Sequence, residues 1–205
     1  MIHKIHGLLW HRSPDELCPS EPIRREFLRE SVRKNDFSLW IICAIVFVAE
    51  GFNIIRVVFL SSSGLGTRNN RIYFSMYCAL ILIALLWLAL RPALRRGTVR
   101  LQWAAQCVMT GLLFLWHMGL NTYDLYRDPA AQTTVLTTAL LGLALLIQSP
   151  PAYTTAMFAA GYLLFSIVMA PLLEAGDRLN LTITFVVALA VSLTHAHHTF
   201  VTLKQ

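Results

Sequence analysis

Ionisable and amide side chains inside apolar stretches are the residues of this sequence that could do chemistry. Glu50, Asn53 and Arg56 lie three residues apart in one such stretch. On a helix, steps of three rotate by roughly −60°, so the three side chains trace a shallow spiral along one side. Such groups are costly in a membrane and usually face a bundle interior or a water-filled cavity. They could bind a polar ligand, or they could join helices while Arg56 reaches toward the interface.

A second polar set lies later in the chain, where His117, Asn121 and Asp124 follow one another at i, i+4 and i+7. This spacing places them within roughly 60° of one another on a helix. Trp116 and Tyr123 flank the set, as they would in an aromatic belt at a membrane interface. The three could contribute to a ligand site or to such a belt. A metal site is poorly supported, because only one histidine is present.

A third set, His195, His197 and His198, lies close to the end of the chain, and His195 and His198 share a helix face. Two histidines from membrane helices can ligate a b-type haem, and His117 is a further candidate ligand. The simpler interpretation is that these histidines lie at the membrane interface. We therefore expect no cofactor and no metal, with haem binding as an alternative.

Composition indicates the class of protein that must position these groups. Of 205 residues, 56% are hydrophobic and 14% are charged, whereas a soluble domain has about 25% charged residues. The net charge is +6, but Lys and Arg lie mainly beside apolar stretches, so the expected counter-charge is anionic lipid and not nucleic acid. Glycine-rich phosphate loops, HExxH and GxSxG are absent from the sequence. We expect a membrane domain without catalytic residues of its own.

Six apolar stretches predict an all-α fold with six transmembrane helices, since a crossing takes about 20 residues with a range near 17–25. The stretches are approximately Phe37–Leu60, Ile72–Leu90, Leu101–Asn121, Thr133–Ile147, Ala152–Leu173 and Leu179–Val201. The fourth is the shortest. Residues 1–36 form a polar N-terminal segment in which Pro22 marks a short helix, either interfacial or continuous with the first span. Residues 37–205 then form the membrane domain.

The distribution of Lys and Arg predicts the orientation. With the N-terminus inside, 12 of these residues face the cytoplasm and four face the outside. Basic residues concentrate on the cytoplasmic side, so both termini are expected there, in the plasma (inner) membrane of a bacterium. No Gly or Pro follows Leu179, so the last helix is expected to continue toward a cytoplasmic output module.

Residues 53–74 combine Asn53-x-x-Arg56, a Ser/Gly loop at 61–66 and the run Asn69-Asn70-Arg71-Ile72-Tyr73-Phe74. This stretch resembles the N-terminal six-helix sensor region of membrane-bound GGDEF proteins of Gram-positive bacteria. The resemblance implies a parallel homodimer whose sixth helix feeds a coiled coil and a diguanylate cyclase that makes cyclic di-GMP. The GGDEF sequence itself is absent here, so the cyclase activity is not assigned to these residues.

The leading hypothesis is therefore a membrane sensor that detects a small polar molecule with an anionic part at the outer face. The predicted ligand-binding residues are Glu50, Asn53, Arg56, Arg71, Tyr73, His117, Asn121 and Asp124. A second hypothesis is a small oligomeric transporter or channel, which would predict polar residues at mid-bilayer and broken helices. A third is the haem-binding membrane protein.

Overall fold

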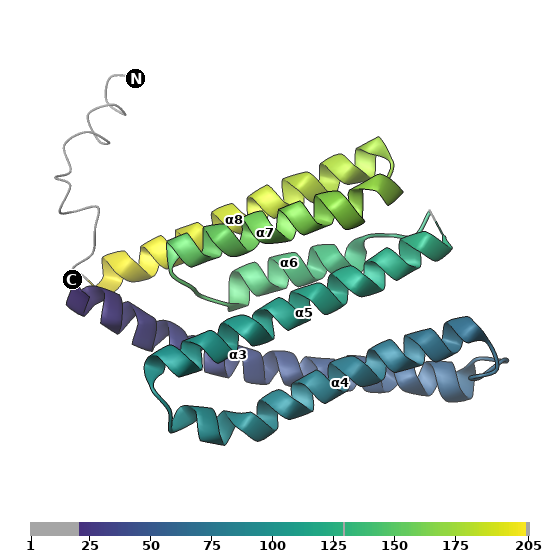
Figure 1. Cartoon of the computed structure of the whole chain (residues 1–205), viewed down its shortest axis with the longest axis horizontal. Helices are drawn as coiled ribbons and strands as arrows, with labels where there is room; N and C mark the ends of the chain where they lie inside the picture. The colour runs from purple at the N-terminus through teal and green to yellow at the C-terminus, as the bar shows by residue number, and fades with distance from the viewer. Residues whose placement is uncertain (1–20, 129, 204–205) are drawn as a thin grey trace.

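A computed structural model describes residues 21–128 and 130–203, which are helical apart from short connections. The helices, labelled as in Figure 1, are α3 (Glu21–Ile55), a π-helical segment η1 (Arg56–Leu60), α4 (Arg68–Arg95), α5 (Val99–Arg127), α6 (Thr134–Leu146), α7 (Pro151–Val168), a 3-10 turn η2 (Ala170–Leu172) and α8 (Ala175–Leu203).

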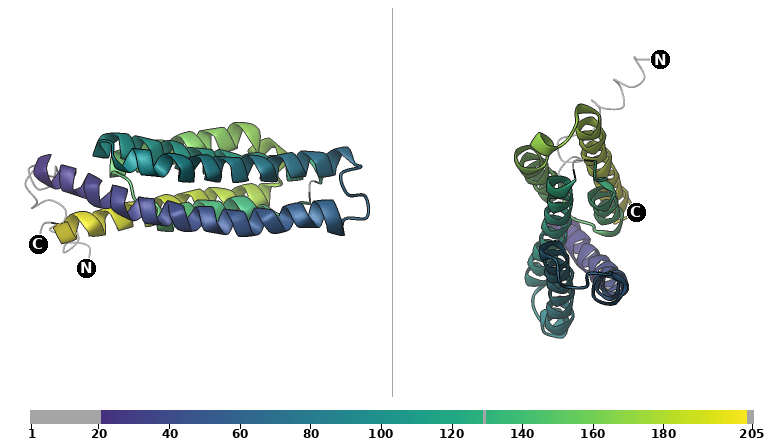
Figure 2. Two further views of the ribbon diagram at one scale, coloured as in Figure 1. Left: turned by 90° about the horizontal axis from the view of Figure 1, so that it is seen from below. Right: turned by 90° about the vertical axis from the view of Figure 1, so that its right-hand side faces the viewer.

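Successive helices run in opposite directions, so the connections gather at two ends of a long bundle (Figures 1 and 2). We call one the basic end. It holds the start of α3, the end of α8 and the α4–α5 connection, with Arg91, Arg95, Arg96 and Arg100. The opposite end, called the cavity end, holds the loop 61–67, the α5–α6 connection and η2. The first and last described helices thus start and finish at the same end.

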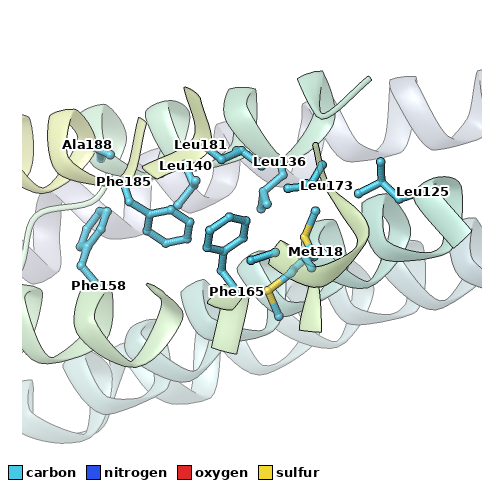
Figure 3. Packing of buried hydrophobic residues seen from close by; sticks show 13 residues of the cluster. Met118, Leu125, Leu136, Leu140, Phe158, Phe165, Leu173, Leu181, Phe185 and Ala188 are labelled. Atoms are coloured by element: carbon cyan, nitrogen blue, oxygen red, sulfur yellow. The ribbon is translucent and has the colours of Figure 1, made fainter. Parts of the chain in front are cut away.

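The bundle consists of two groups of three helices. One group contains α3, α4 and α5, and the other contains α6, α7 and α8; α5 also contacts α6, and α3 contacts α8. Figure 3 shows the core of the second group, in which Phe158, Phe165 and Phe185 pack beside Leu140 and Leu181. Many apolar side chains on the outer surface are exposed, as they are on helices surrounded by lipid.

The expectation of an all-helical fold is confirmed and its long apolar helices fit a multi-pass membrane protein, but the predicted number of six spans is not confirmed. Five described helices are long and apolar enough to cross a membrane. The sixth apolar helix, α6, has only 13 residues. At about 1.5 Å per residue it is about 20 Å long, shorter than a hydrocarbon core of about 30 Å. At the start, α3 continues without a break from Glu21 to Ile55, so the N-terminal helix is an extension of the first span.

Two buried asparagines satisfy the backbone at the two ends of α6. At the cavity end, the Asn121 amide donates to the Gln132 carbonyl oxygen at 3.1 Å and accepts from the Leu136 N–H at 2.6 Å. At the basic end, Asn35 both donates to the Gln148 carbonyl oxygen and accepts from the Gln148 N–H, each at 2.7 Å. Non-helical backbone is tolerated at membrane depth only when protein groups satisfy it. The asparagines therefore allow α6 to be short.

Ion pairs and an aromatic stack fix the basic end. Arg91 on α4 binds Asp36 on α3 in a bidentate pair, with N–O distances of 2.8 and 2.9 Å, and Arg95 binds the same carboxylate. Phe27 near the start of α3 stacks on Phe200 near the end of α8, with ring centroids 3.9 Å apart. These contacts connect α3 to its two neighbours at this end of the bundle.

The Asn35 bridge can be tested by replacing Asn35 with leucine. The change leaves the buried N–H and carbonyl of Gln148 without their side-chain partner, at roughly 1–3 kcal/mol for each unpaired group. We expect a lower melting temperature in detergent, measured by loss of helical circular dichroism. The matched control is Asn180→Leu, because Asn180 is exposed and its side chain has no hydrogen-bond partner among the described residues. Equal melting temperatures for both variants would contradict the role of Asn35.

Candidate functional site

A polar cavity of about 570 Å³ opens at the cavity end, between the α3–η1 segment, α4, α5 and the first turn of α6. Its walls are formed by Asn53, Arg56, Val57, Leu60, Ser61, Asn70, Tyr73, Tyr77, Leu120, Asp124, Arg127 and Val135. Polar and charged groups from three helices and a loop therefore face one space.

The first wall contains the π-helical segment η1. The Ser61 N–H donates to the Arg56 carbonyl oxygen at 2.9 Å, which closes a wider turn than that of an α-helix. In this segment Val57 is buried against the bundle, whereas Arg56 is exposed and lines the cavity. Such π-helical turns occur frequently at functional sites.

The loop 61–67 forms the rim and is organised by one side chain. The Asn70 amide nitrogen lies 2.6 Å from the Gly64 carbonyl oxygen and 3.1 Å from the Ser63 hydroxyl. Gly64 has φ of +49°, in the left-handed region that glycine adopts without strain. The Thr67 hydroxyl accepts from the Asn70 N–H at 3.2 Å and so caps α4. The rim of the cavity is thus held in a defined shape.

Tyr73 connects α4 to α5 across the cavity. Its hydroxyl donates to the Asp124 carboxylate and accepts from the Arg127 guanidinium at 3.0 Å. The Arg127 guanidinium carbon also lies 5.4 Å from the centre of the Tyr73 ring, within the range of a cation–π contact. Beside this set, the Tyr123 hydroxyl donates to the Asn69 side-chain oxygen at 3.0 Å. The two helices are therefore joined by polar contacts at the mouth of the cavity.

The charges of the cavity favour an anionic guest. Two guanidinium groups, Arg56 and Arg127, and one carboxylate, Asp124, line it. Within the described residues, neither arginine has a carboxylate oxygen within 4 Å, and Oδ1 of Asp124 accepts from the Tyr73 hydroxyl. Val135 brings the first turn of α6 to the wall, where the helix dipole is positive. Unused guanidinium N–H groups can form charge-assisted bonds to a carboxylate or phosphate.

Half of the sequence-predicted ligand residues line this cavity: Asn53, Arg56, Tyr73 and Asp124. Glu50 lies behind them, where its buried carboxylate accepts from the Asn53 amide at 3.1 Å and orients that side chain.

The other three predicted residues lie outside the cavity. Asn121 is fully buried and both ends of its amide bind the backbone at the start of α6. His117 is partly buried, with its Nδ1 2.6 Å from the Leu113 carbonyl oxygen and its ring edge-on to Trp116. Arg71 opens onto a different groove of α4. His117 and Asn121 both lie on α5, as their spacing predicts. The neighbouring helices determine which contacts the two side chains make.

Four polar residues of the cavity were not among the predicted ligand residues: Ser61, Asn70, Tyr77 and Arg127. Arg127 lies three residues after Asp124, so the same helical spacing that selected Asp124 could have found it. Asn70 belongs to the run that carries the family resemblance, but its contacts with the loop depend on how that loop folds back. Nothing in the sequence marks that geometry.

The histidines proposed as haem ligands are distributed between two regions of the bundle. His117 lies in the half of α5 nearer the cavity end, whereas His195 and His198 lie near the end of α8, at the basic end. Across residues 21–128 and 130–203, no group of three or more His, Cys, Asp or Glu side chains could hold a metal ion.

Comparison with known proteins gives no relative: no family model, curated protein or solved structure matches this chain.

The Tyr73 connection can be tested with Tyr73→Phe. The variant keeps the ring but removes the hydroxyl, so Asp124 loses a donor and Arg127 an acceptor, at a cost of about 1 kcal/mol or more. We expect a lower melting temperature in detergent. Tyr126→Phe is the matched control, because the Tyr126 side chain is 79% exposed and has no hydrogen-bond partner among the described residues. A Tyr73→Phe protein that melts with the parent would show that the connection contributes no stability.

Proposed function

We propose that this chain is the receptor domain of a membrane sensor, which binds a small anionic molecule in the cavity at 53–135 and signals to a cytoplasmic output module. The observation that carries the proposal is the pair Arg56 and Arg127, which face one cavity without a carboxylate partner within the described residues. The guest has a carboxylate or phosphate group between the two guanidiniums, and this group accepts a hydrogen bond from the Asn53 amide. Asp124 favours a guest that also carries an N–H or hydroxyl donor.

The distribution of basic residues supports an outward-facing cavity. Arg91, Arg95, Arg96 and Arg100 gather at the opposite end of the bundle, next to the start of α3. Basic residues near membrane spans are retained preferentially in the cytoplasm. With that orientation, the ligand enters from outside, and the start of α3 and the end of α8 lie on the cytoplasmic side.

The short helix α6 offers a mechanical connection between the cavity and α8. Val135 in its first turn lines the cavity, and Gln148 just after its last turn donates from its side chain to the Thr199 hydroxyl on α8 at 2.5 Å. A ligand shifts a conformational equilibrium only by binding one state more tightly than the other. A guest that contacts η1, α4 and α6 at once stabilises one position of α6. Through the hydrogen bond between Gln148 and Thr199, that position of α6 then determines the position of α8.

The resemblance of residues 53–74 to the sensor regions of GGDEF proteins supports a diguanylate cyclase as the output and a parallel dimer as the active assembly. The exposed residues of α8 are suited to such a dimer. Val187, Ala190, Thr194, His197 and Val201 are exposed and follow the alternating spacing of three and four that forms a coiled-coil seam.

Ligand binding can be tested by thermal stabilisation of the purified protein in detergent, with succinate and inorganic phosphate as probes. A ligand at 100 times its dissociation constant stabilises the folded state by about 2.7 kcal/mol. We expect at least one probe to raise the melting temperature of the parent. The variant Arg127→Gln loses a charge-assisted bond and should weaken binding roughly tenfold or more.

The control is Arg100→Gln, since Arg100 is exposed at the basic end and has no ion-pair partner among the described residues. This variant should respond like the parent. Equal responses from Arg127→Gln and the parent would contradict the cavity as the anion site. A parent that responds to neither anion, while both variants melt normally, would contradict the anionic guest.

The dimer can be tested by single cysteines placed along α8 in a protein from which Cys18, Cys43, Cys78 and Cys107 have been removed. Cysteines at Ala190, Thr194 and Val201 should form cross-links in oxidised membranes, because these positions are exposed on one face. Cysteines at Ser192, Ala196 and Thr199 serve as controls, because these positions are buried inside the bundle. Absence of cross-links at all three exposed positions would contradict a parallel pair through α8.

The short α6 favours a second candidate function, a transporter. Carriers place interrupted helices beside their substrate sites, and α6 ends within the bundle next to the buried side chains of Gln148 and Thr199. Uptake of radiolabelled succinate or phosphate into vesicles that contain the protein would distinguish the two. Accumulation above that of protein-free vesicles favours the transporter, and binding without uptake favours the receptor.

A further inference from the structure

Arg71, which does not line the polar cavity, lines a second groove of about 390 Å³ on another face of α4. Arg68 and Arg71 are at the top of this groove, in the first turn of α4. Below them the lining is mainly apolar, with Ile72, Met76 and Ala79 from α4 and Trp116 from α5. The hydroxyl of Ser75, which also lines the groove, donates to the Arg71 carbonyl oxygen. The groove therefore has a cationic end and an apolar floor.

The floor is held in place by a hydrogen bond between the two helices. The indole N–H of Trp116 donates to the Met76 carbonyl oxygen at 2.9 Å, so the ring forms a fixed wall between α4 and α5. The donor of the indole is thereby satisfied, and the ring offers only apolar surface to an occupant. A soluble anion bound to the arginines would leave this surface uncovered.

The top of the groove has a positive charge that no described residue neutralises. Neither Arg68 nor Arg71 has a carboxylate oxygen within 4 Å in the described part of the chain. Both lie where the positive end of the α4 dipole adds to the attraction for an anion.

The apolar surface continues below the groove along α4. Ala79, Leu82 and Leu86 share one helix face, and the two leucines are 63% and 59% exposed. An occupant that satisfies the whole surface has an anionic head at the first turn of α4 and a long apolar chain parallel to the helix.

We propose that this groove binds an anionic phospholipid, with the phosphate between Arg68 and Arg71 and one acyl chain against Trp116 and the leucine face of α4. The proposal is independent of the receptor function, because the groove and the polar cavity share no residue. Since α4 forms a wall of both, a lipid held here supports the helix that carries Tyr73.

The test uses the intrinsic fluorescence of Trp116 and bromine, which quenches indole on contact. The full chain is reconstituted in phosphatidylcholine vesicles that contain a small fraction of phosphatidylglycerol with brominated acyl chains. Brominated phosphatidylcholine at the same fraction is the reference. The Trp116 contribution is the quenching that disappears in Trp116→Phe, which separates it from the other tryptophans.

We expect the Trp116 contribution to be larger with the anionic lipid than with the reference lipid. A basic residue near an anionic headgroup contributes about a fivefold preference for the anionic lipid. The double variant Arg68→Gln with Arg71→Gln should therefore abolish the excess of Trp116 quenching by the anionic lipid over the reference lipid. The matched control is Arg96→Gln with Arg100→Gln at the basic end, which should retain it. Circular dichroism and melting temperature confirm that each variant is folded.

A second variant, Ala79→Phe, tests the part of the groove that binds the acyl chain and leaves both arginines in place. Ala79 is exposed in the groove, so a phenyl ring there fills the floor without entering the core. Loss of the excess quenching in this variant supports a groove-bound chain. Equal quenching by the two lipids in the parent, an excess that survives the double Arg68/Arg71 change, or an excess that survives Ala79→Phe would each overturn the assignment.

Discussion

Hydrogen bonding of the backbone around α6 is the interaction on which the rest of the structure depends. A 13-residue helix inside a bundle of longer helices leaves non-helical chain within the bundle on both sides. If this chain were exposed to lipid, each backbone N–H or carbonyl group without a hydrogen-bond partner would cost several kcal/mol of free energy. Asn121 and Asn35 provide the missing partners, and each comes from a helix of the first group. The two halves of the bundle are therefore joined by the same bonds that allow α6 to exist.

The position of the polar cavity follows from this arrangement. The start of α6, fixed by Asn121, brings Val135 toward α5, while η1 turns Arg56 toward α4. Tyr73 then closes the space by joining Asp124 and Arg127. These contacts use one oxygen of the carboxylate, and no described carboxylate pairs with the guanidiniums of Arg56 and Arg127. The cavity therefore retains a positive character that suits an anionic guest.

The first part of α4 separates two environments that both attract anions. Tyr73 and Tyr77 face the polar cavity, whereas Ile72, Met76 and Ala79 face the apolar groove below Arg68 and Arg71. A small soluble anion and a phospholipid would thus contact different faces of the same helix. The difference lies in what surrounds the charge: amide, phenol and carboxylate groups in one case, and hydrocarbon in the other.

The sequence by itself determined the class, the helical content and the approximate helix positions, because apolar stretches of spanning length have few stable alternatives in a membrane. It also identified Asn53, Arg56, Tyr73 and Asp124 as residues with a reason to face a common space, since a charged or amide group is costly in lipid. The tertiary structure decided the surroundings of Asn121, Arg71 and Arg127. Helical spacing gives the face of one helix, but the packing of its neighbours determines whether a polar side chain meets a cavity, a helix end or lipid.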